Sequence, residues 1–209
     1  MKIKVCGLKE SENINAVTAL SPDYVGFIFY GPSLRFINDL PVAALNDIPA
    51  EIYKTAVFVN ESGDKIADLI NKYKFNAIQL HGAESPEFCK LFRNNVQVIK
   101  AFGLSSDFDF DQLEPYADNI DLFLFDTKTD THGGSGKTFD WAILSQYKLD
   151  IPFFLSGGIG PDNLAEIKKI NHPQFYGIDL NSKFETAPGI KDINKLEKAF
   201  DIIKQTQYK

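Results

Sequence analysis

The amino-acid sequence predicts an α/β protein, a (β/α)8 TIM barrel that occupies residues 1–209 as a single domain. Two observations predict this fold. Short apolar runs, rich in β-branched and aromatic residues, alternate with helical stretches about eight times, which is typical of parallel strands joined by right-handed crossovers. In addition, a polar residue ends nearly every apolar run, as expected where the ends of parallel strands build one site.

Eight apolar runs bounded by polar turns are the predicted strands. They span residues 3–6, 24–29, 54–59, 77–81, 96–102, 122–126, 153–156 and 176–180. The order of units is also compatible with an open doubly wound sheet, but the count of about eight favours the closed barrel. Eight units in 209 residues is near the short end for this fold, so the loops must be tight.

Helix signals fall between these strands. Residues 62–73 carry apolar side chains at helical spacing. Ser85 followed by Pro86 predicts a helix that begins near residue 86. Asp192 is predicted to cap the last helix, whose apolar residues recur on one face. The sequence shows no linker, low-complexity tract or block of charge, so we predict no internal boundary.

Composition and charge restrict the class of protein. Hydrophobic residues make up 44% of the chain, enough for a sizeable core, and the net charge is −6. An acidic chain argues against nucleic acid or an anionic membrane as a partner, because either requires a basic surface. The two cysteines lack metal-type spacing and indicate a reducing compartment. Without a long apolar leader or membrane-length run, we expect a cytoplasmic protein.

Cys6 and Asp126 are the most informative of the polar strand ends. Each is a titratable side chain that closes an apolar run and opens a loop. In one parallel barrel both would lie at the same rim, where a thiol and a carboxyl form an acid–base pair that moves protons on a small molecule. An isolated cysteine is more often a buried apolar residue. The place of Cys6 opposite Asp126 favours the functional interpretation, whereas Cys89 is assigned to the core.

Three further polar residues are candidates for binding. Arg35 lies in the second loop, His81 ends the fourth strand and Asp179 lies near the end of the eighth. Arg35 could be a solvated cation or could bind a carboxylate. For His81 a role in shaping the rim is as well supported as one in binding. Asp179 could simply cap the turn that follows it.

Side-chain parity along the strands predicts a polar barrel floor. If Cys6 points inward so does Lys4, and if His81 points inward so does Gln79. Buried polar groups need partners, so either the barrel floor is a hydrogen-bonded network or one of these strands is shifted in register. Lys100 could suggest the Schiff-base lysine of an aldolase, but a lone lysine is weak evidence and we favour a structural role.

Two loops predict a phosphate site. The glycine-rich residues 156–160 follow the seventh strand, and Asn181 and Ser182 follow the eighth. These loops hold phosphate groups in barrels through backbone N–H groups, and glycine lets the backbone approach the anion. We therefore expect Gly157, Gly158, Asn181 and Ser182 to bind a phosphate.

Residues 133–138, Gly-Gly-Ser-Gly-Lys-Thr, imitate the end of a nucleotide-binding P-loop. That motif requires a glycine where Thr131 stands, and the stretch lies well past its strand. We therefore reject nucleotide binding. The segment 127–137 instead suits a lid that closes over the substrate.

Seven segments between residues 4 and 192 match one family in order. They are Lys-Val-Cys-Gly (4–7), Gly-Phe-Ile-Phe (26–29) with Ser33 and Arg35, Gln-Leu-His-Gly (79–82), Phe-Asp-Thr (125–127), Gly-Gly-Ser-Gly-Lys-Thr-Phe-Asp-Trp (133–141), Ser-Gly-Gly-Ile (156–159) and Pro-Gly-Ile-Lys-Asp (188–192). On these segments the chain resembles the phosphoribosylanthranilate isomerases of tryptophan biosynthesis over almost its whole length.

The resemblance implies an Amadori rearrangement of an N-linked aminoaldose phosphate to an aminoketose phosphate, without a metal or organic cofactor. Asp126 would be the general acid that protonates the furanose ring oxygen, and Cys6 the general base that removes the C2′ proton. Arg35 would face the anthranilate carboxylate, and Asp179 would hold sugar hydroxyls. The family usually carries Ser-Ser-Gly after the aspartate of strand eight, where this chain has Asn-Ser-Lys at 181–183.

Two alternatives come from other functional classes. An epimerase or aldolase barrel is the nearest enzyme rival, but epimerases rely on metal-ligating histidines, and of His81, His132 and His172 only the first ends a strand. A non-catalytic barrel that binds phosphosugars would need only the anion site, and the intact Cys6 and Asp126 argue against it. The expected partner is a small phosphosugar, and the sequence predicts no oligomeric state.

Overall fold

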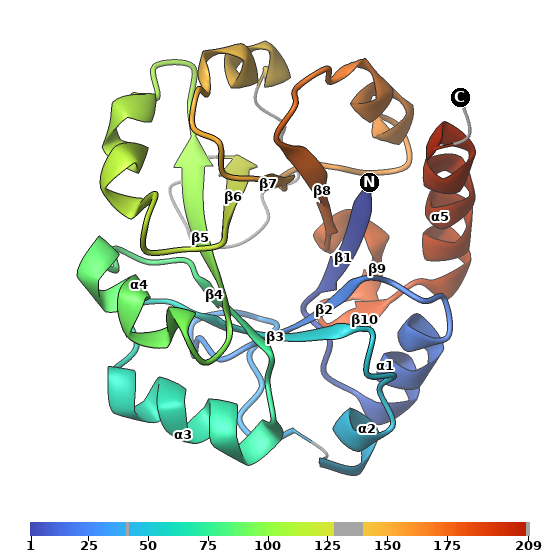
Figure 1. Ribbon diagram of the computed structural model, residues 1–209. Helices are drawn as coiled ribbons and strands as arrows, with labels where there is room; N and C mark the ends of the chain where they lie inside the picture. Colours follow the sequence, from blue (N-terminus) through green and yellow to red (C-terminus); the bar gives the residue numbers. More distant parts are fainter. Residues whose placement is uncertain (41, 128–139, 208–209) are drawn as a thin grey trace.

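Eight parallel strands form a closed barrel in the computed structural model, which describes residues 1–40, 42–127 and 140–207 (Figure 1). Each strand pairs with the next along the chain, and the last pairs with the first. The strands are β1 Lys2–Cys6, β2 Tyr24–Ile28, β3 Tyr53–Phe58, β4 Ala77–Leu80, β5 Gln97–Leu104, β6 Leu122–Thr127, β7 Phe153–Leu155 and β8 Phe175–Leu180. The predicted barrel is confirmed, and the open doubly wound sheet is excluded.

Within the described residues, five α-helices lie outside the barrel. They are α1 Ser11–Thr18, α2 Val42–Asn46, α3 Gly63–Tyr73, α4 Pro86–Arg93 and α5 Ile193–Gln207. The predicted N-caps are confirmed, because the Ser85 hydroxyl accepts a hydrogen bond from the Phe88 N–H at 3.3 Å and the Asp192 carboxylate accepts one from the Lys195 N–H at 3.1 Å. These caps satisfy backbone donors that the first turn leaves unpaired.

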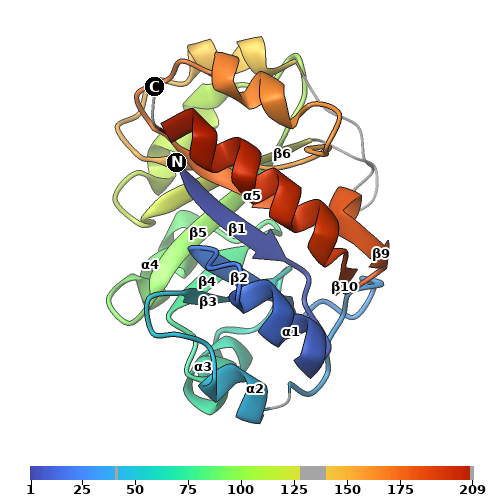
Figure 2. The same cartoon turned by 90° about the vertical axis from the view of Figure 1, so that its right-hand side faces the viewer.

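The second half of the barrel is covered differently from the first. Short 3-10 helices follow β5, β6 and β7 in place of α-helices (Figure 1). They are η1 Phe110–Tyr116, η2 Trp141–Gln146 and η3 Leu164–Lys169. After β8 come a single 3-10 turn, η4 Ser182–Phe184, and an antiparallel hairpin of β9 Glu185–Ala187 and β10 Ile190–Lys191. Figure 2 shows this hairpin at the end of the barrel toward which β1 points.

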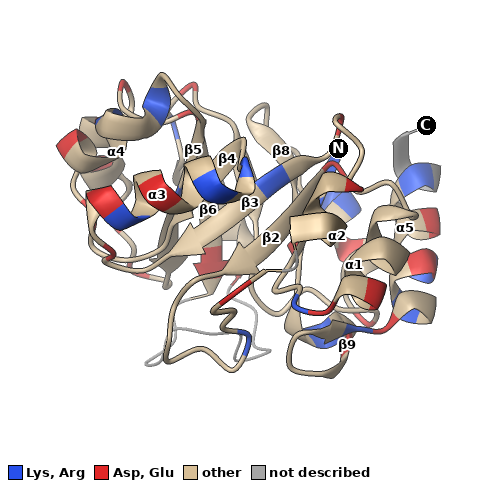
Figure 3. Cartoon of the chain, turned by 90° about the horizontal axis from the view of Figure 1, so that it is seen from below, with Lys and Arg blue, Asp and Glu red and all other residues tan. Residues whose placement is uncertain are grey.

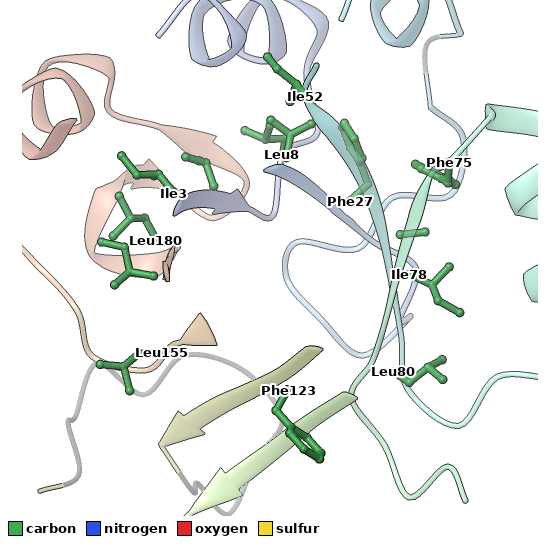
Figure 4. Close-up of a cluster of buried hydrophobic side chains, with 14 of the residues drawn as sticks. Ile3, Leu8, Phe27, Ile52, Phe75, Ile78, Leu80, Phe123, Leu155 and Leu180 are labelled. Atoms are coloured by element: carbon green, nitrogen blue, oxygen red, sulfur yellow. The ribbon is translucent and has the colours of Figure 1, made fainter. Parts of the chain in front are cut away.

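Alternating side chains divide the core into two layers. Apolar residues that point outward from the strands pack against the helices, and Figure 4 shows part of this layer, with Phe27 on β2 and both Ile78 and Leu80 on β4. A smaller apolar cluster, which includes Leu124 and Phe154, fills the barrel interior. The period-2 alternation therefore leaves Lys4 and Cys6, which lie on opposite parity to Ile3 and Val5, free to point inward.

Charged side chains of both signs are spread along α3, α4 and α5 (Figure 3). Both cysteines are buried and unpaired as free thiols, and Cys89 lies fully buried in the core, as predicted. A search of the described residues finds no helix with the length and apolar character needed to cross a membrane.

Candidate active site

A cavity that is partly open to solvent lies at the carboxyl ends of the barrel strands. Its walls come from the ends of seven of the eight strands or from the loops that follow them. The lining includes all predicted site residues except Arg35, namely Cys6, His81, Asp126, Gly157, Gly158, Asp179, Asn181 and Ser182. The fold thus brings together residues that are as much as 176 positions apart.

Cys6 is the last residue of β1 and its side chain is almost completely buried. A Cβ atom built on Gly26 of the neighbouring strand would lie only 2.6 Å from the Cys6 Sγ, so the glycine makes room for the thiol. Burial raises the pKa of Cys6, and the Lys4 ammonium opposes this rise. Because only the thiolate is a base, the nearby cation matters for the reactivity of Cys6.

A buried ion pair lies on the barrel floor beneath Cys6. The strand register places Lys4 opposite Asp179, and the Lys4 Nζ lies 3.0 Å from the Asp179 Oδ1. The Ser156 hydroxyl donates to the other carboxylate oxygen at 3.5 Å. Burial disfavours the Lys4 ammonium, but Asp179 and Cys6 together raise its pKa. The predicted polar network is confirmed here, since the inward-pointing lysine has a partner.

Asp126 lies one residue before the end of β6 and is partly exposed to the cavity. Burial raises its pKa to about 6, and the negative charge of Asp179 adds to the rise. Its Oδ1 accepts a hydrogen bond from the Thr127 N–H at 2.8 Å, which lowers the pKa in part. A carboxyl with a pKa near 6 still carries protons near neutral pH, as a general acid requires.

His81 lies beside Asp126 at the rim. Its Nε2 is 3.7 Å from the Asp126 Oδ2, and its Nδ1 is 3.0 Å from the side-chain nitrogen of Gln79. An amide nitrogen can only donate, so in this assignment Nδ1 accepts and Nε2 carries the ring hydrogen. That tautomer directs an N–H toward the carboxylate and toward the cavity.

The loops after β7 and β8 form the predicted glycine-rich wall. Gly157 has φ +85°, and a Cβ atom there would lie 2.4 Å from the Thr127 N and 2.5 Å from the Asp126 Oδ1. Only glycine fits this position without strain or collision. The Asn163 side chain holds the loop, because it accepts from the Gly160 N–H at 2.8 Å and donates to the Gly158 carbonyl at 3.0 Å.

Lys183 takes the position where the resembled family usually has glycine, and it lies at the contact between these two loops. A Cβ atom on Gly160 would lie 3.1 Å from the Lys183 Cβ, so the lysine stem packs against the loop after β7. The Lys183 residue itself is exposed. Its stem therefore joins the two loops that are expected to hold a phosphate.

Arg35 is the predicted site residue that does not line the cavity. Its guanidinium pairs with Glu185, with 2.7 Å between Nη2 and Oε2, and Glu185 also accepts from the Lys191 Nζ at 2.6 Å. Neither Glu185 nor Lys191 was predicted from the sequence, although Lys191 lies in the matched segment 188–192. Neither residue ends a barrel strand, so the strand-end rule gave no signal for them.

Lys100 does not line the cavity either. Its Nζ lies 3.1 Å from Glu84 and donates to backbone carbonyls, and both side chains are buried. This ion pair is in keeping with the structural role expected for Lys100. The proposed lid and the stretch that imitates a P-loop lie outside the described residues, except for Thr127.

Comparison with known proteins gives a consistent result. A family model described as N-(5'phosphoribosyl)anthranilate (PRA) isomerase matches residues 3–202. An N-(5'-phosphoribosyl)anthranilate isomerase from Parabacteroides distasonis is 46% identical over 200 residues, which cover 94% of this chain and 90% of the relative. One from Thermotoga maritima is 34% identical over 199 residues, covering 94% and 95%.

Solved structures are similar over the same length. The phosphoribosyl anthranilate isomerase of Thermus thermophilus has a TM-score of 0.83 and 27% identity, and the alignment covers 98% of this chain and 99% of that chain. Another phosphoribosyl anthranilate isomerase structure contains reduced 1-(o-carboxyphenylamino)-1-deoxyribulose 5-phosphate. Its TM-score is 0.82 and its identity 29%, again covering 98% and 99%.

Proposed function

The chain belongs to the N-(5'-phosphoribosyl)anthranilate isomerase family and is an isomerase of tryptophan biosynthesis, and we propose that Cys6 and Asp126 are its acid–base pair. The reaction is the Amadori rearrangement of N-(5-phosphoribosyl)anthranilate to 1-(2-carboxyphenylamino)-1-deoxyribulose 5-phosphate. The observation that carries the assignment is that the two side chains line one cavity at the carboxyl end of the barrel.

Asp126 is proposed to start the reaction as general acid. Its proton goes to the furanose ring oxygen while the bond from that oxygen to C1′ breaks. The lone pair of the anthranilate nitrogen forms the second bond to C1′, which leaves a cationic Schiff base on the substrate. The raised pKa of Asp126, about 6, supports this role because the carboxyl must hold its proton until the ring opens.

Cys6 is proposed to act next as general base. Its thiolate takes the proton from C2′, and the electrons of that C–H bond form the C1′–C2′ double bond of an enolamine, which neutralises the Schiff base. The enolamine then loses its hydroxyl proton and gains one at C1′, which gives the ketone with no net change in composition. The buried Lys4 ammonium favours the thiolate electrostatically, although the net effect of the surroundings is a raised pKa of Cys6.

The remaining site residues are proposed to bind the substrate. The phosphate would lie on the backbone of Gly157, Gly158, Asn181 and Ser182, where glycine lets N–H groups approach the anion. Asp179 would accept hydrogen bonds from sugar hydroxyls. In addition, His81 would donate an N–H at the rim, and Arg35 would bind the anthranilate carboxylate. We propose that this chemistry uses no cofactor and that the partner is a small phosphosugar.

The first test is a direct assay. Phosphoribosylanthranilate is made in situ from anthranilate and phosphoribosyl pyrophosphate, and the loss of its fluorescence is followed after the protein is added without metal. We expect rapid loss with the wild-type chain and none above background with Cys6→Ala or Asp126→Asn. Near-normal turnover by folded Asp126→Asn would refute the acid assignment.

A binding measurement separates the rival classes. Cys6→Ala should still bind the reduced product analogue by calorimetry, because the phosphate loops are unchanged. Binding without turnover in the wild-type chain would instead favour a binding-only barrel. A cytoplasmic location is also proposed, supported by the net charge of −6 and the two free cysteines.

A further inference from the structure

The Arg35–Glu185 ion pair is a bidentate charged contact close to residues that line the cavity. The Arg35 Nε donates to both Glu185 oxygens, at 2.9 and 3.1 Å, and the Nη2 donates to Oε2 at 2.7 Å. The two side chains are only 12% and 5% exposed. A buried bidentate pair of this kind fixes the plane and the direction of the guanidinium.

Glu185 is itself held by the hairpin that follows β8. Its Oε1 accepts from the Lys191 Nζ at 2.6 Å and from the Gly189 N–H at 3.1 Å. The Lys191 backbone is fixed in turn by Asn13, which accepts from its N–H at 2.7 Å and donates to its carbonyl at 2.9 Å. The carboxylate therefore has little freedom to turn.

This cluster lies directly behind the cavity wall. The Lys191 Nζ donates to the Oδ1 of Asn181, which lines the cavity, at 2.8 Å. A Cβ atom on Gly7, the residue after Cys6, would lie 2.7 Å from the Arg35 Cδ and 3.0 Å from the same Asn181 oxygen. The stem of Arg35 thus runs along the backbone next to Cys6.

Donor geometry and charge suit the cluster to a second carboxylate. Glu185 occupies the edge of the guanidinium formed by Nε and Nη2, and a guanidinium has five N–H donors, so the edge formed by Nη1 and Nη2 can serve another anion. Because Glu185 is shared between Arg35 and Lys191, the three charges sum to +1. A simple Arg–Glu pair would be neutral and would attract an anion only weakly.

We propose that Glu185, held by Lys191, is a positioning residue that directs Arg35 at the carboxylate of the anthranilate ring and so sets specificity for carboxylate-bearing substrates. This inference rests on the proposed role of Arg35. It assigns a function to the segment 188–192, which the catalytic steps leave without one.

The test compares two ligands by calorimetry. One is the reduced product analogue with its ring carboxylate, and the other is the same compound prepared from aniline, which lacks that carboxylate. The measured quantity is the Kd of the aniline compound divided by the Kd of the carboxylate compound. In Glu185→Gln we expect this ratio to fall about tenfold, chiefly because the carboxylate ligand binds more weakly. Glu197→Gln, at an exposed site on α5, is the matched control and should keep the wild-type ratio.

The outcomes distinguish the inference from the proposed function. Equal weakening of both ligands in Glu185→Gln would show a merely structural hairpin contact, and tighter binding of the carboxylate ligand would show that Glu185 competes with substrate. Either result overturns the inference. Arg35→Met should reduce the Kd ratio to near one, and Glu185→Gln should then change it no further. An unchanged ratio in folded Arg35→Met would overturn the proposed role of Arg35 itself.

Discussion

Cys6 and Asp126 titrate in an order opposite to the one the reaction needs. The pKa of Asp126 is about 6, whereas burial raises that of the Cys6 thiol above its ordinary value. Between these two values most free enzyme carries an ionised carboxyl and a neutral thiol. The form that can react, with a protonated Asp126 carboxyl and a Cys6 thiolate, is a minor population. Between these two pKa values the fraction of this form is constant with pH. A rise in pH lowers the fraction of protonated Asp126 by the same factor by which it raises the fraction of Cys6 thiolate.

The first prediction concerns the pH dependence of kcat/KM. We expect a rise up to about pH 6, where Asp126 titrates, followed by a plateau that ends only when Cys6 ionises. The measurement is the fluorescence assay between pH 4.5 and 9.5, with the Asp126 pKa determined independently by carbon NMR. A profile that passes through pH 6 without a break would contradict the assignment.

A pair of glycine substitutions tests how tightly the loop after β7 is built. Gly157→Ala would add a Cβ against the backbone N of Thr127 at φ +85°, so we expect a loss of more than about 2 kcal/mol of unfolding free energy and no activity. Gly189→Ala has a similar φ of +90°, but its Cβ would meet the flexible Lys9 side chain. It should cost only about 1–2 kcal/mol. Urea unfolding of both variants checks the difference, and equal losses would contradict it.

Single residues were predictable where they end a strand and unpredictable where they depend on distant partners. Cys6, Asp126 and Asp179 follow from the rule that polar residues at strand ends form the site of a barrel. Glu185 and Glu84 could not be found that way. Each is defined by a buried cation that lies elsewhere in the fold, and no local pattern reports such a pair.

At the scale of elements, the strand pattern was informative and the covering helices were less so. All eight predicted strands are present, with bounds that differ by at most two residues. The α-helices with clear caps were also predicted. The 3-10 helices were not, because they are short and lack a full helical repeat; η1 even contains Pro115, which has no N–H to donate. The β9–β10 hairpin was missed because its strands have three and two residues.

The loop after β4 depends on one buried ion pair. The Lys100 Nζ donates to the carbonyls of Leu80 and Gly82, on either side of His81, and to Glu84. Glu84 in turn accepts from two backbone N–H groups. This arrangement fixes the segment that carries the rim histidine.

Removing one member of this pair should be costly. Lys100→Met leaves the Glu84 carboxylate buried without its cation, so we expect a loss of about 3–5 kcal/mol of unfolding free energy. Glu84→Gln in the same chain should restore a large part of it, because no net charge then stays buried. Urea denaturation of both variants decides the matter; a double variant as unstable as the single one would contradict this explanation.

For the whole molecule, the site lowers stability as pH rises. A raised carboxyl pKa means that the folded protein binds the proton more tightly than the unfolded chain, so the cost of ionisation begins above pH 3.8 and is complete above about pH 6. The shift corresponds to about 3 kcal/mol as an upper value. The raised pKa therefore helps Asp126 to hold its proton for catalysis, but it also lowers the stability of the folded protein once the carboxyl ionises.

Asp126→Asn should stabilise the protein in a pH-dependent way. Asparagine keeps the acceptor for the Thr127 N–H but cannot ionise. We expect the variant to exceed wild type by up to about 3 kcal/mol at pH 7.5 and by about 1 kcal/mol at pH 4.5. Urea unfolding at both values measures the difference. A variant that is no more stable than wild type at pH 7.5 would show that the ionised Asp126 carboxylate does not destabilise the folded protein.

The closure of β8 onto β1 has a consequence for how the protein is made. Lys4 and Cys6 are translated well before Asp179 and the hairpin that ends at Lys191. Until that later segment has been made, the nascent chain therefore carries an unpartnered lysine and an uncovered thiol. Neither the barrel nor the site is complete until β8 and the hairpin have been translated, so chains terminated before them should be inactive and dependent on quality control.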